Sequence, residues 1–149
     1  EIRLSLVGSE MCIRDRLMSD GDVAGGINAA RHAARTDMCV GVGGSPEGIV
    51  TACAIKALGG HIQGRLWPRD DDERQRGIDA GLDMDKVYEA DDLVRGDNTI
   101  FVATGVTDGQ LVAGVRREHG YIYTESVVLR GASGTLRRIA SEHLVSKWL

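Results

Sequence analysis

A chain of 149 residues, 42% hydrophobic and 27% charged, is long enough for one domain with an aliphatic core. Its formal net charge of −4 argues against nucleic acid as a main partner, because no basic stripe is present to neutralise phosphates. No apolar segment is long enough to cross a membrane and no signal peptide is recognisable, so these features predict a cytoplasmic protein with no membrane partner.

The first sixteen residues differ from the rest of the chain. Residues 6–16, LVGSEMCIRDR, resemble the translation of a transposon-type sequencing adaptor. We therefore expect residues 1–16 to be non-native and the domain to comprise residues 17–149. Periodicity alone also permits an ordinary strand over residues 2–7.

Strands and helices alternate along the next hundred residues. In chain order, the apolar and turn patterns predict a strand end at 17–19, a helix over 23–35, a strand over 37–42, a helix over 47–58, a strand over 62–67, an exposed helix from 69 to near Gly81, a short helix over 91–96, a buried strand over 99–104 and a helix over 110–115. Segments 121–130 and 135–140, rich in Val, Ile and Tyr, flank a glycine-containing turn and predict an antiparallel hairpin.

This order predicts an α/β fold with a mixed, mostly parallel sheet and flanking helices on both faces. In such a sheet, ligands bind beyond the carboxyl ends of the strands. Three unusual loops, at residues 20–22, 43–47 and 104–108, follow expected strands. We therefore expect these loops to share one edge of the sheet and to form the binding site.

The stretch 39–60 organises the chain: a short apolar run passes into glycines, then Ser45-Pro46-Glu47, then an apolar helix. Ser45 suits the N-cap and Pro46 the first helical position. A glycine loop at a helix N-terminus gathers backbone N–H groups at one point, which suits a phosphate. Glu47 would repel that phosphate unless a divalent cation were held between the two. Alternatively, Glu47 only complements the helix dipole.

Asp20 and Asp22 form a second candidate site. Asp22 can cap the following helix, whereas Asp20 has no such structural need. Two neighbouring carboxylates cost free energy unless a cation or hydroxyl groups use them. The pair therefore predicts a polyhydroxylated ligand, since carboxylates accept hydrogen bonds from neighbouring sugar hydroxyls.

Other residue types carry less information about function. The cysteines at 12, 39 and 53 lack metal-ligand spacing, and Cys39 and Cys53 lie in apolar runs that predict small core residues. The four histidines also lack ligand spacing. The mixed charges of residues 69–76 predict a solvated helix face.

The sequence lacks two common nucleotide-binding motifs, and one other phosphatase mechanism remains an alternative. The glycine loop lacks the third glycine of a dinucleotide fingerprint and the Gly-Lys-Ser/Thr of a Walker loop. An aspartyl-nucleophile phosphatase would begin with a strand ending in Asp20-x-Asp22, and Thr104 would suit a second phosphate contact. Ala24 and the absence of a lysine between Thr104 and Lys147 weaken that alternative.

Several motifs together resemble one enzyme family, the class II (GlpX-type) fructose-1,6-bisphosphatases. They are SDGDVAG at 19–25, GVGGSPEG at 41–48, LGG at 58–60, QGRLWP at 63–68 and ATGVTDG at 103–109. Residues 126–130 and 133–135 resemble the closing hairpin of that family. The resemblance covers the chain from Leu17 to its end, and implies the C-terminal part, somewhat under half, of such an enzyme.

The resemblance implies a layered α/β architecture of the inositol-monophosphatase-like superfamily and hydrolysis of the 1-phosphate of fructose 1,6-bisphosphate in gluconeogenesis, with Mg²⁺ or Mn²⁺ as cofactor. By position, Asp20, Gly21 and Asp22 would lie against the fructose part of this sugar bisphosphate. Gly44 would contribute a backbone contact and Glu47 a metal ligand.

What the sequence lacks is as informative as what it contains. The family's other acidic metal ligands have no counterpart here, and the resemblance places them upstream of Leu17. We therefore expect the chain alone to be inactive, and the full-length parent to be a homo-oligomer, dimer or tetramer. A non-catalytic sugar-phosphate binding module made from the same loops is the alternative.

Overall fold

The computed structural model describes residues 16–18 and 21–147. Within them the helices are α1 (Asp22–Ala30), α2 (Ser45–Ala57), α3 (Asp71–Asp79) and α4 (Ala90–Leu93). The strands are β1 (Gln63–Arg65), β2 (Val87–Glu89), β3 (Ile100–Thr104), β4 (Arg116–Glu118), β5 (Tyr121–Arg130) and β6 (Thr135–Leu144). Single 3-10 turns, Gly131–Ser133 and Val145–Lys147, follow β5 and β6.

Every strand pairing in the described part of the chain is antiparallel. β1 pairs with β2 in a small two-stranded sheet, and β5 pairs with β3, β4 and β6 in a larger one. The chain is therefore a mixed α/β fold as expected, but the expectation of a mostly parallel sheet is wrong for these residues.

The parallel sheet does not form because the strand expected over residues 37–42 has no partner strand among the described residues. Residues 37–42 form an irregular segment in which Met38, Val40 and Val42 are exposed by 75%, 81% and 78%. A strand is stable only when its backbone N–H and C=O groups find a neighbouring strand. The apolar pattern of this segment is compatible with a strand, but the described residues provide nothing for it to pair with. Cys39 is consequently exposed, not in the core as expected.

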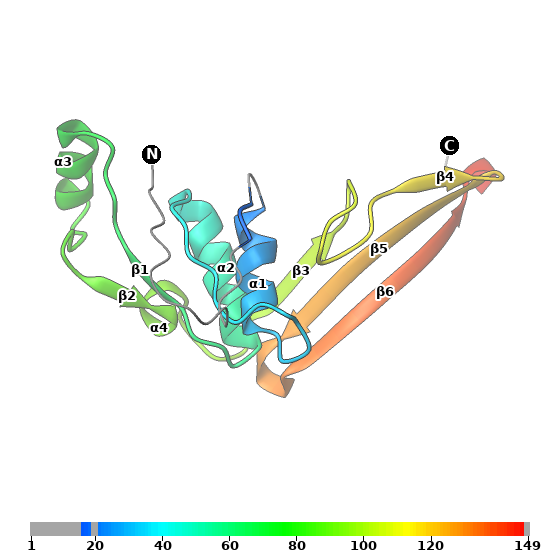
Figure 1. Ribbon diagram of the computed structural model, residues 1–149, viewed down its shortest axis with the longest axis horizontal. Helices are drawn as coiled ribbons and strands as arrows, with labels where there is room; N and C mark the ends of the chain where they lie inside the picture. Colours follow the sequence, from blue (N-terminus) through cyan, green and yellow to red (C-terminus); the bar gives the residue numbers. More distant parts are fainter. Residues whose placement is uncertain (1–15, 19–20, 148–149) are drawn as a thin grey trace, which may run out of the picture.

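Helices α1 and α2 run side by side in the same direction and form the centre of the molecule (Figure 1). Gly26 of α1 faces Thr51 of α2, and a Cβ built on Gly26 would lie 2.5 Å from the Thr51 methyl group. Nearer the ends of the two helices, Ala30 packs against Gly60, which follows α2. Because small residues line this contact, the two helix axes approach closely, and both N-termini lie at one end of the pair.

One face of the larger sheet carries the core. Helix α2 packs on β3 and β5 there, together with Ile27 of α1. The buried cluster is Ile27, Ala54, Ala57, Phe101, Leu111, Val112, Val127 and Leu129. The opposite face of β3 is open, and Ile100 and Val102 are exposed by 60% and 59%. The expected buried strand is thus a half-exposed strand at the edge of the sheet.

The hairpin of β5 and β6 confirms the sequence expectation and extends it. Ten residue pairs, from Tyr121↔Leu144 to Arg130↔Thr135, join the two strands. The turn closes at Gly134, whose φ of +56° is a conformation that glycine adopts without strain. The hairpin projects well beyond the helices (Figure 1).

On the other side of the helices lies a smaller lobe of β1, β2, α3 and α4 (Figure 1). The exposed helix α3 confirms the expected helix after residue 69, and Asp70 caps it by accepting a hydrogen bond of 2.7 Å from the Glu73 N–H. Lys56 at the end of α2 ties the lobe to the core, because its Nζ lies 2.7 Å from Asp91 of α4. This ion pair raises the pKa of Lys56 above its ordinary value.

Two expected helices differ from the structure. The helix predicted over 23–35 begins at Asp22 and ends at Ala30. The chain then continues towards the exposed segment 37–42. The helix predicted over 110–115 is an irregular loop. Contacts with β5 and β6, described below, hold this loop and replace the hydrogen bonds of a helix.

Candidate functional site

The first part of the candidate site is the start of α1. Gly21 is its N-cap, with φ of +93°, a left-handed conformation that strains any other residue. Asp22 is the first helical residue, where a negative charge is favoured by the helix dipole. Asp20, the other predicted sugar-binding residue, lies outside the described residues.

The second part is the start of α2. Gly44 is the N-cap in an extended conformation, and Ser45 and Pro46 form the first turn. The cap is therefore one residue earlier than expected, and no side chain caps this end of the helix. Glu47 lies in the same first turn and is exposed.

The carboxylates of Asp22 and Glu47 meet neighbouring residues of one loop. A Cβ built on Gly43 would lie 2.6 Å from Oδ2 of Asp22, and one built on Gly44 would collide with Oε2 of Glu47. Consecutive Cα atoms are about 3.8 Å apart, so both acidic groups lie within one short stretch of backbone. The packing of α1 beside α2 brings Asp22 to Gly43, whereas Glu47 lies near Gly44 within the first turn of its own helix.

The arrangement combines two kinds of ligand-binding group. The N-cap residues of α1 and α2, Gly21 and Gly44, have no side chain with which to cap the helix, and the N–H groups at a helix N-terminus are donors suited to a phosphate or another anion. The two carboxylates accept hydrogen bonds from hydroxyl groups or coordinate hard cations. A ligand that carries both hydroxyl and phosphate groups fits this combination.

The described residues do not complete a metal centre. Among residues 16–18 and 21–147, no group of three or more His, Cys, Asp or Glu side chains is placed to hold a metal ion. Hard cations in protein sites take several oxygen ligands. Glu47 therefore fits the role of one ligand of a divalent cation, and the remaining ligands would have to come from elsewhere.

The residues just after the third predicted loop, 104–108, reach α1 part-way along the helix. The side-chain amide of Gln110 meets that of Asn28 at 3.2 Å, six residues and about 9 Å along the helix from Asp22. Thr104 is 2.8 Å from the Ser126 hydroxyl, as a cross-strand pair on the open face of the sheet. The Thr104 hydroxyl, which the aspartyl-nucleophile alternative would use for a second phosphate contact, is thus hydrogen-bonded to the neighbouring strand.

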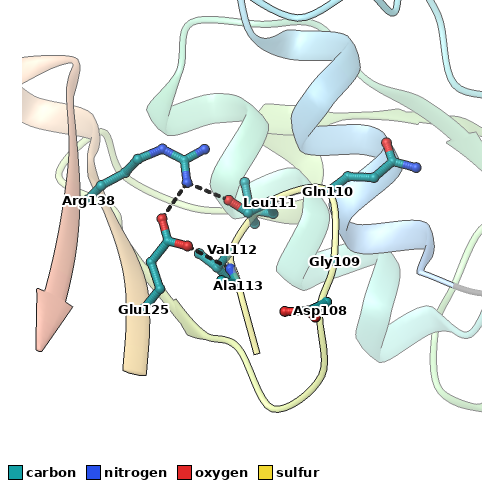
Figure 2. Close-up of a pocket in the computed structure, with 8 residues that line it drawn as sticks. All are labelled: Asp108, Gly109, Gln110, Leu111, Val112, Ala113, Glu125 and Arg138. Carbon is teal, nitrogen blue, oxygen red and sulfur yellow. Dashed lines mark hydrogen bonds and ion pairs between the residues drawn. The ribbon is translucent and has the colours of Figure 1, made fainter. Parts of the chain in front are cut away.

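An open cavity of about 370 Å³ lies between the segment 108–113 and the hairpin (Figure 2). Its lining residues are Asp108, Gly109, Gln110, Leu111, Val112, Ala113, Glu125 and Arg138. Glu125 accepts a hydrogen bond of 2.6 Å from the Ala113 N–H and pairs with Arg138 at 2.8 Å. Arg138 also donates to the Leu111 carbonyl at 2.8 Å.

These contacts lower the pKa of Glu125, the Ala113 N–H contributing most and Arg138 next. They explain how the irregular loop is fixed, and sequence reasoning missed them. The two residues are thirteen positions apart and carry no motif. Only the register of β5 and β6 brings their side chains together.

Comparison with known proteins identifies the family. The profile described as bacterial fructose-1,6-bisphosphatase, glpX-encoded, matches residues 8–143. The chain belongs to this family. A class 2 fructose-1,6-bisphosphatase of Haemophilus influenzae is similar to the chain, with 41% identity over 137 residues, 83% of this chain and 41% of that protein. Fructose-1,6-bisphosphatase 1 class 2 of Escherichia coli K12 is 37% identical over 151 residues, 93% of this chain and 45% of that protein.

This glpX-type chain spans less than half the length of the curated relatives it matches. The matched range includes helices α1–α4, strands β1–β5 and all of β6 except its last residue. It begins within residues 1–16. In the part of the chain that the structure describes, no helix has the length and apolar character needed to cross a membrane.

Proposed function

We propose that the chain is the sugar-binding part of a class II fructose-1,6-bisphosphatase that releases the 1-phosphate of fructose 1,6-bisphosphate. The observation that carries the proposal is the meeting of Asp22 and Glu47 at the Gly43–Gly44 loop. The names of the similar proteins support this choice of substrate. As part of the same proposal, the parent enzyme is cytoplasmic and homo-oligomeric.

Each residue of the site has a proposed role. The carboxylate of Asp22, with that of Asp20, accepts hydrogen bonds from the hydroxyl groups of the sugar. The left-handed backbone at Gly21 sets the direction in which the chain enters α1. Gly44 offers its backbone to the substrate at the start of α2, and Glu47 holds a divalent cation, Mg²⁺ or Mn²⁺, close to it.

The bound cation would supply charge neutralisation and an activated water for attack on phosphorus. The residues of this chain bind and orient the sugar beside it. The N-termini of α1 and α2, with their backbone N–H groups and the positive end of the helix dipole, favour the negative charge of a sugar phosphate at the same place.

We further propose that the 149-residue chain binds a sugar phosphate without hydrolysing it. The supporting observation is that the described residues contain no group of three metal-ligating side chains. One or two carboxylates do not hold a catalytic cation firmly, since hard cations take about six or more oxygen ligands. In this respect the isolated chain corresponds to the binding module considered as the alternative function.

Binding and turnover measurements on the purified chain test the proposal. We expect fructose 6-phosphate to shift the amide NMR signals of Gly21, Asp22, Gly44 and Glu47. Asp22→Asn removes charge from a sugar-binding carboxylate, so we expect it to weaken binding by about tenfold or more, in line with hydrogen bonds to charged groups. Phosphate release from fructose 1,6-bisphosphate with Mn²⁺ should not exceed that of Glu47→Ala.

Asp72→Asn is the matched control, because Asp72 lies in the first turn of the exposed helix α3 and carries the same charge at a similar helix position. It should leave binding unchanged. Signals that move in α3 rather than in α1 and α2 would contradict the proposed site. Phosphate release above the Glu47→Ala level would contradict the proposed division between binding and hydrolysis.

A further inference from the structure

Strand β6 forms a ten-residue outer edge of the larger sheet. Within the described residues it pairs with β5 alone, and no strand covers its other side. Figure 1 shows it along the outside of the projecting hairpin. An exposed strand edge offers a row of backbone donors and acceptors to another strand.

Two backbone hydrogen bonds show which residues of β6 point outward. The Gly105 N–H donates to the Glu125 carbonyl at 3.0 Å, so the backbone groups of Glu125 point towards β3 and away from β6. Its partner Ala140 therefore points its own N–H and C=O away from β5. At the end of the strand, the Val145 N–H donates inward to the Gly120 carbonyl at 3.0 Å, and this fixes the same alternation independently.

The outward set consists of every second residue: Leu136, Arg138, Ala140, Glu142 and Leu144. The side chains of this set share the face of the sheet that carries Glu125 and the core residues Val127 and Leu129. The residue types of this set are arranged symmetrically about Ala140, apart from the sign of the charge. A positive residue and a leucine precede the centre, and a negative residue and a leucine follow it.

We propose that the outer edge of β6 binds β6 of a second copy of this chain, antiparallel and centred on Ala140. A twofold axis perpendicular to the sheet then sets Ala140 opposite the partner's Ala140. Arg138 lies opposite the partner's Glu142, and Leu136 opposite the partner's Leu144. Each of the five facing pairs is a hydrogen-bonded pair, which gives about ten backbone hydrogen bonds across the interface.

The charges select this register over its neighbours. An axis through Arg138 or through Glu142 would place like charges directly opposite each other, which is destabilising. Axes through Ile139 or Ser141 would oppose Arg138 to an alanine or a leucine. Only the axis through Ala140 makes two opposite-charge pairs and two leucine pairs at once.

The side chains are available for these pairs. Glu142 is exposed and makes no ion pair with any described residue. The bonds that Arg138 makes to Glu125 and to the Leu111 carbonyl both use Nη1. A guanidinium has five N–H donors in all, so Arg138 can hold its own loop and the partner's Glu142 together.

Sedimentation velocity on the 149-residue chain tests the pairing. We expect a dimer of about twice the chain mass of 16.0 kDa. Ala140→Pro removes the central outward N–H without removing a bond to β5, and proline is tolerated at edge-strand positions that point to solvent. We therefore expect this variant to be monomeric at the same concentration.

Glu142→Lys makes both ionic pairs repulsive and should weaken the dimer by about tenfold or more. Glu118→Lys is the matched control. It makes the same charge change on β4, at the opposite edge of the sheet, and should leave the dimer unchanged.

Amide hydrogen exchange provides a measurement that does not depend on any variant. In the dimer, the N–H groups of Arg138, Ala140 and Glu142 should exchange slowly, as those of Arg137, Ile139 and Ser141 do through their bonds to β5. On dilution to monomer only the first set should become fast. The pairing is overturned by a chain that stays monomeric, by a dimer that survives Ala140→Pro and Glu142→Lys, or by outward amides protected in a monomer, which would mean that another segment of the chain covers β6.

Discussion

Glu125 shows how one side chain can replace a missing element of secondary structure. Its carboxylate accepts from the Ala113 N–H and pairs with Arg138, and Arg138 in turn holds the Leu111 carbonyl (Figure 2). The loop over 110–115 lacks helical hydrogen bonds, so these contacts satisfy its backbone. The loop also meets α1 through Gln110 and Asn28. The Glu125–Arg138 pair therefore stabilises a loop that contacts α1, the helix that begins at Asp22.

The lowered pKa of Glu125 gives this role a measurable pH dependence. A carboxyl whose pKa is lower in the folded chain stabilises the fold above its ordinary pKa of 4.5, and this stabilisation is lost as the pH falls through the lower folded value. Glu125→Gln should lower the melting temperature by a few degrees at pH 7. The difference from the native chain should shrink steadily as the pH is lowered below about 4.

Thermal melts of both chains between pH 3 and pH 7 provide the measurement. Glu118→Gln is the control, because Glu118 is half-exposed and only faces Arg116 at 3.5 Å. It should cause little change at any pH. An equal loss of stability for Glu125→Gln at pH 3 and pH 7 would show that the charge of Glu125 does not contribute.

At the scale of elements, the contact of α1 with α2 sets the position of the two carboxylates. The contact is tight at Gly26, where a Cβ would lie 2.5 Å from the methyl group of Thr51. The hydroxyl of Thr51 is engaged with the Glu47 carbonyl at 2.7 Å, so its methyl group is held against α1. Glycine is thus required at position 26 by its neighbour and not by its own backbone.

A double-mutant cycle tests this contact. In the native background, the overpacking caused by Gly26→Ala costs about 1–3 kcal/mol, which offsets or exceeds the gain of about 1 kcal/mol in helix propensity. Thr51→Ser removes only the methyl group and keeps the hydroxyl. In that background Gly26→Ala should stabilise the chain by about 0.5–1 kcal/mol.

Urea unfolding measures the four free energies of the cycle. Gly48→Ala is the control on α2, because a Cβ there has open space around it. It should stabilise the chain equally in both backgrounds. If Gly26→Ala had the same effect in the native chain and in the Thr51→Ser variant, the close helix contact would be refuted.

The elements that the sequence predicted best are those whose signals are local. Helix α2 follows from its apolar run and its Ser-Pro-Glu start, and the hairpin follows from two Val/Ile-rich strands around a glycine turn. The strand expected over 37–42 and the helix expected over 110–115 failed for a different reason. Their structure depends on residues far away in the chain, a missing strand partner in one case and Glu125 with Arg138 in the other.

The candidate site followed the same rule. The sequence identified the pair Asp20 and Asp22, and Glu47, as residues with unusual chemistry. Asp20 lies outside the described residues, and the structure brings Asp22 and Glu47 to one loop. The expected reason was a shared edge of a parallel sheet, whereas the observed reason is the parallel packing of two helices. The third loop, residues 104–108, was expected at the same place because the sheet was expected to be parallel. In the structure it follows β3 of an antiparallel sheet, and Gln110 just after it contacts Asn28 of α1.

At the scale of the whole molecule, several large apolar side chains are exposed. They lie in the segment 37–42 and on the open face of β3, where Val40 and Val42 are exposed by 81% and 78% and Ile100 and Val102 by 60% and 59%. Large exposed apolar patches mark sites of association. The longer relatives have more than half of their length outside the matched region, which is enough chain to cover such surfaces.

We therefore expect the isolated chain to form large, irregular aggregates in addition to the β6 dimer. Both apolar surfaces lie away from the outer edge of β6, so replacing Val40, Val42 and Val102 with Thr should remove the large species and leave the dimer intact. Val→Thr keeps the side-chain shape and adds a hydroxyl, which suits a solvated position. Sedimentation velocity and light scattering distinguish the two kinds of association, since one depends on these valines and the other on Ala140 and Glu142. A native chain free of large aggregates at high concentration would show that these surfaces are already covered, and the exposed segment 37–42 would then have to pack differently in solution.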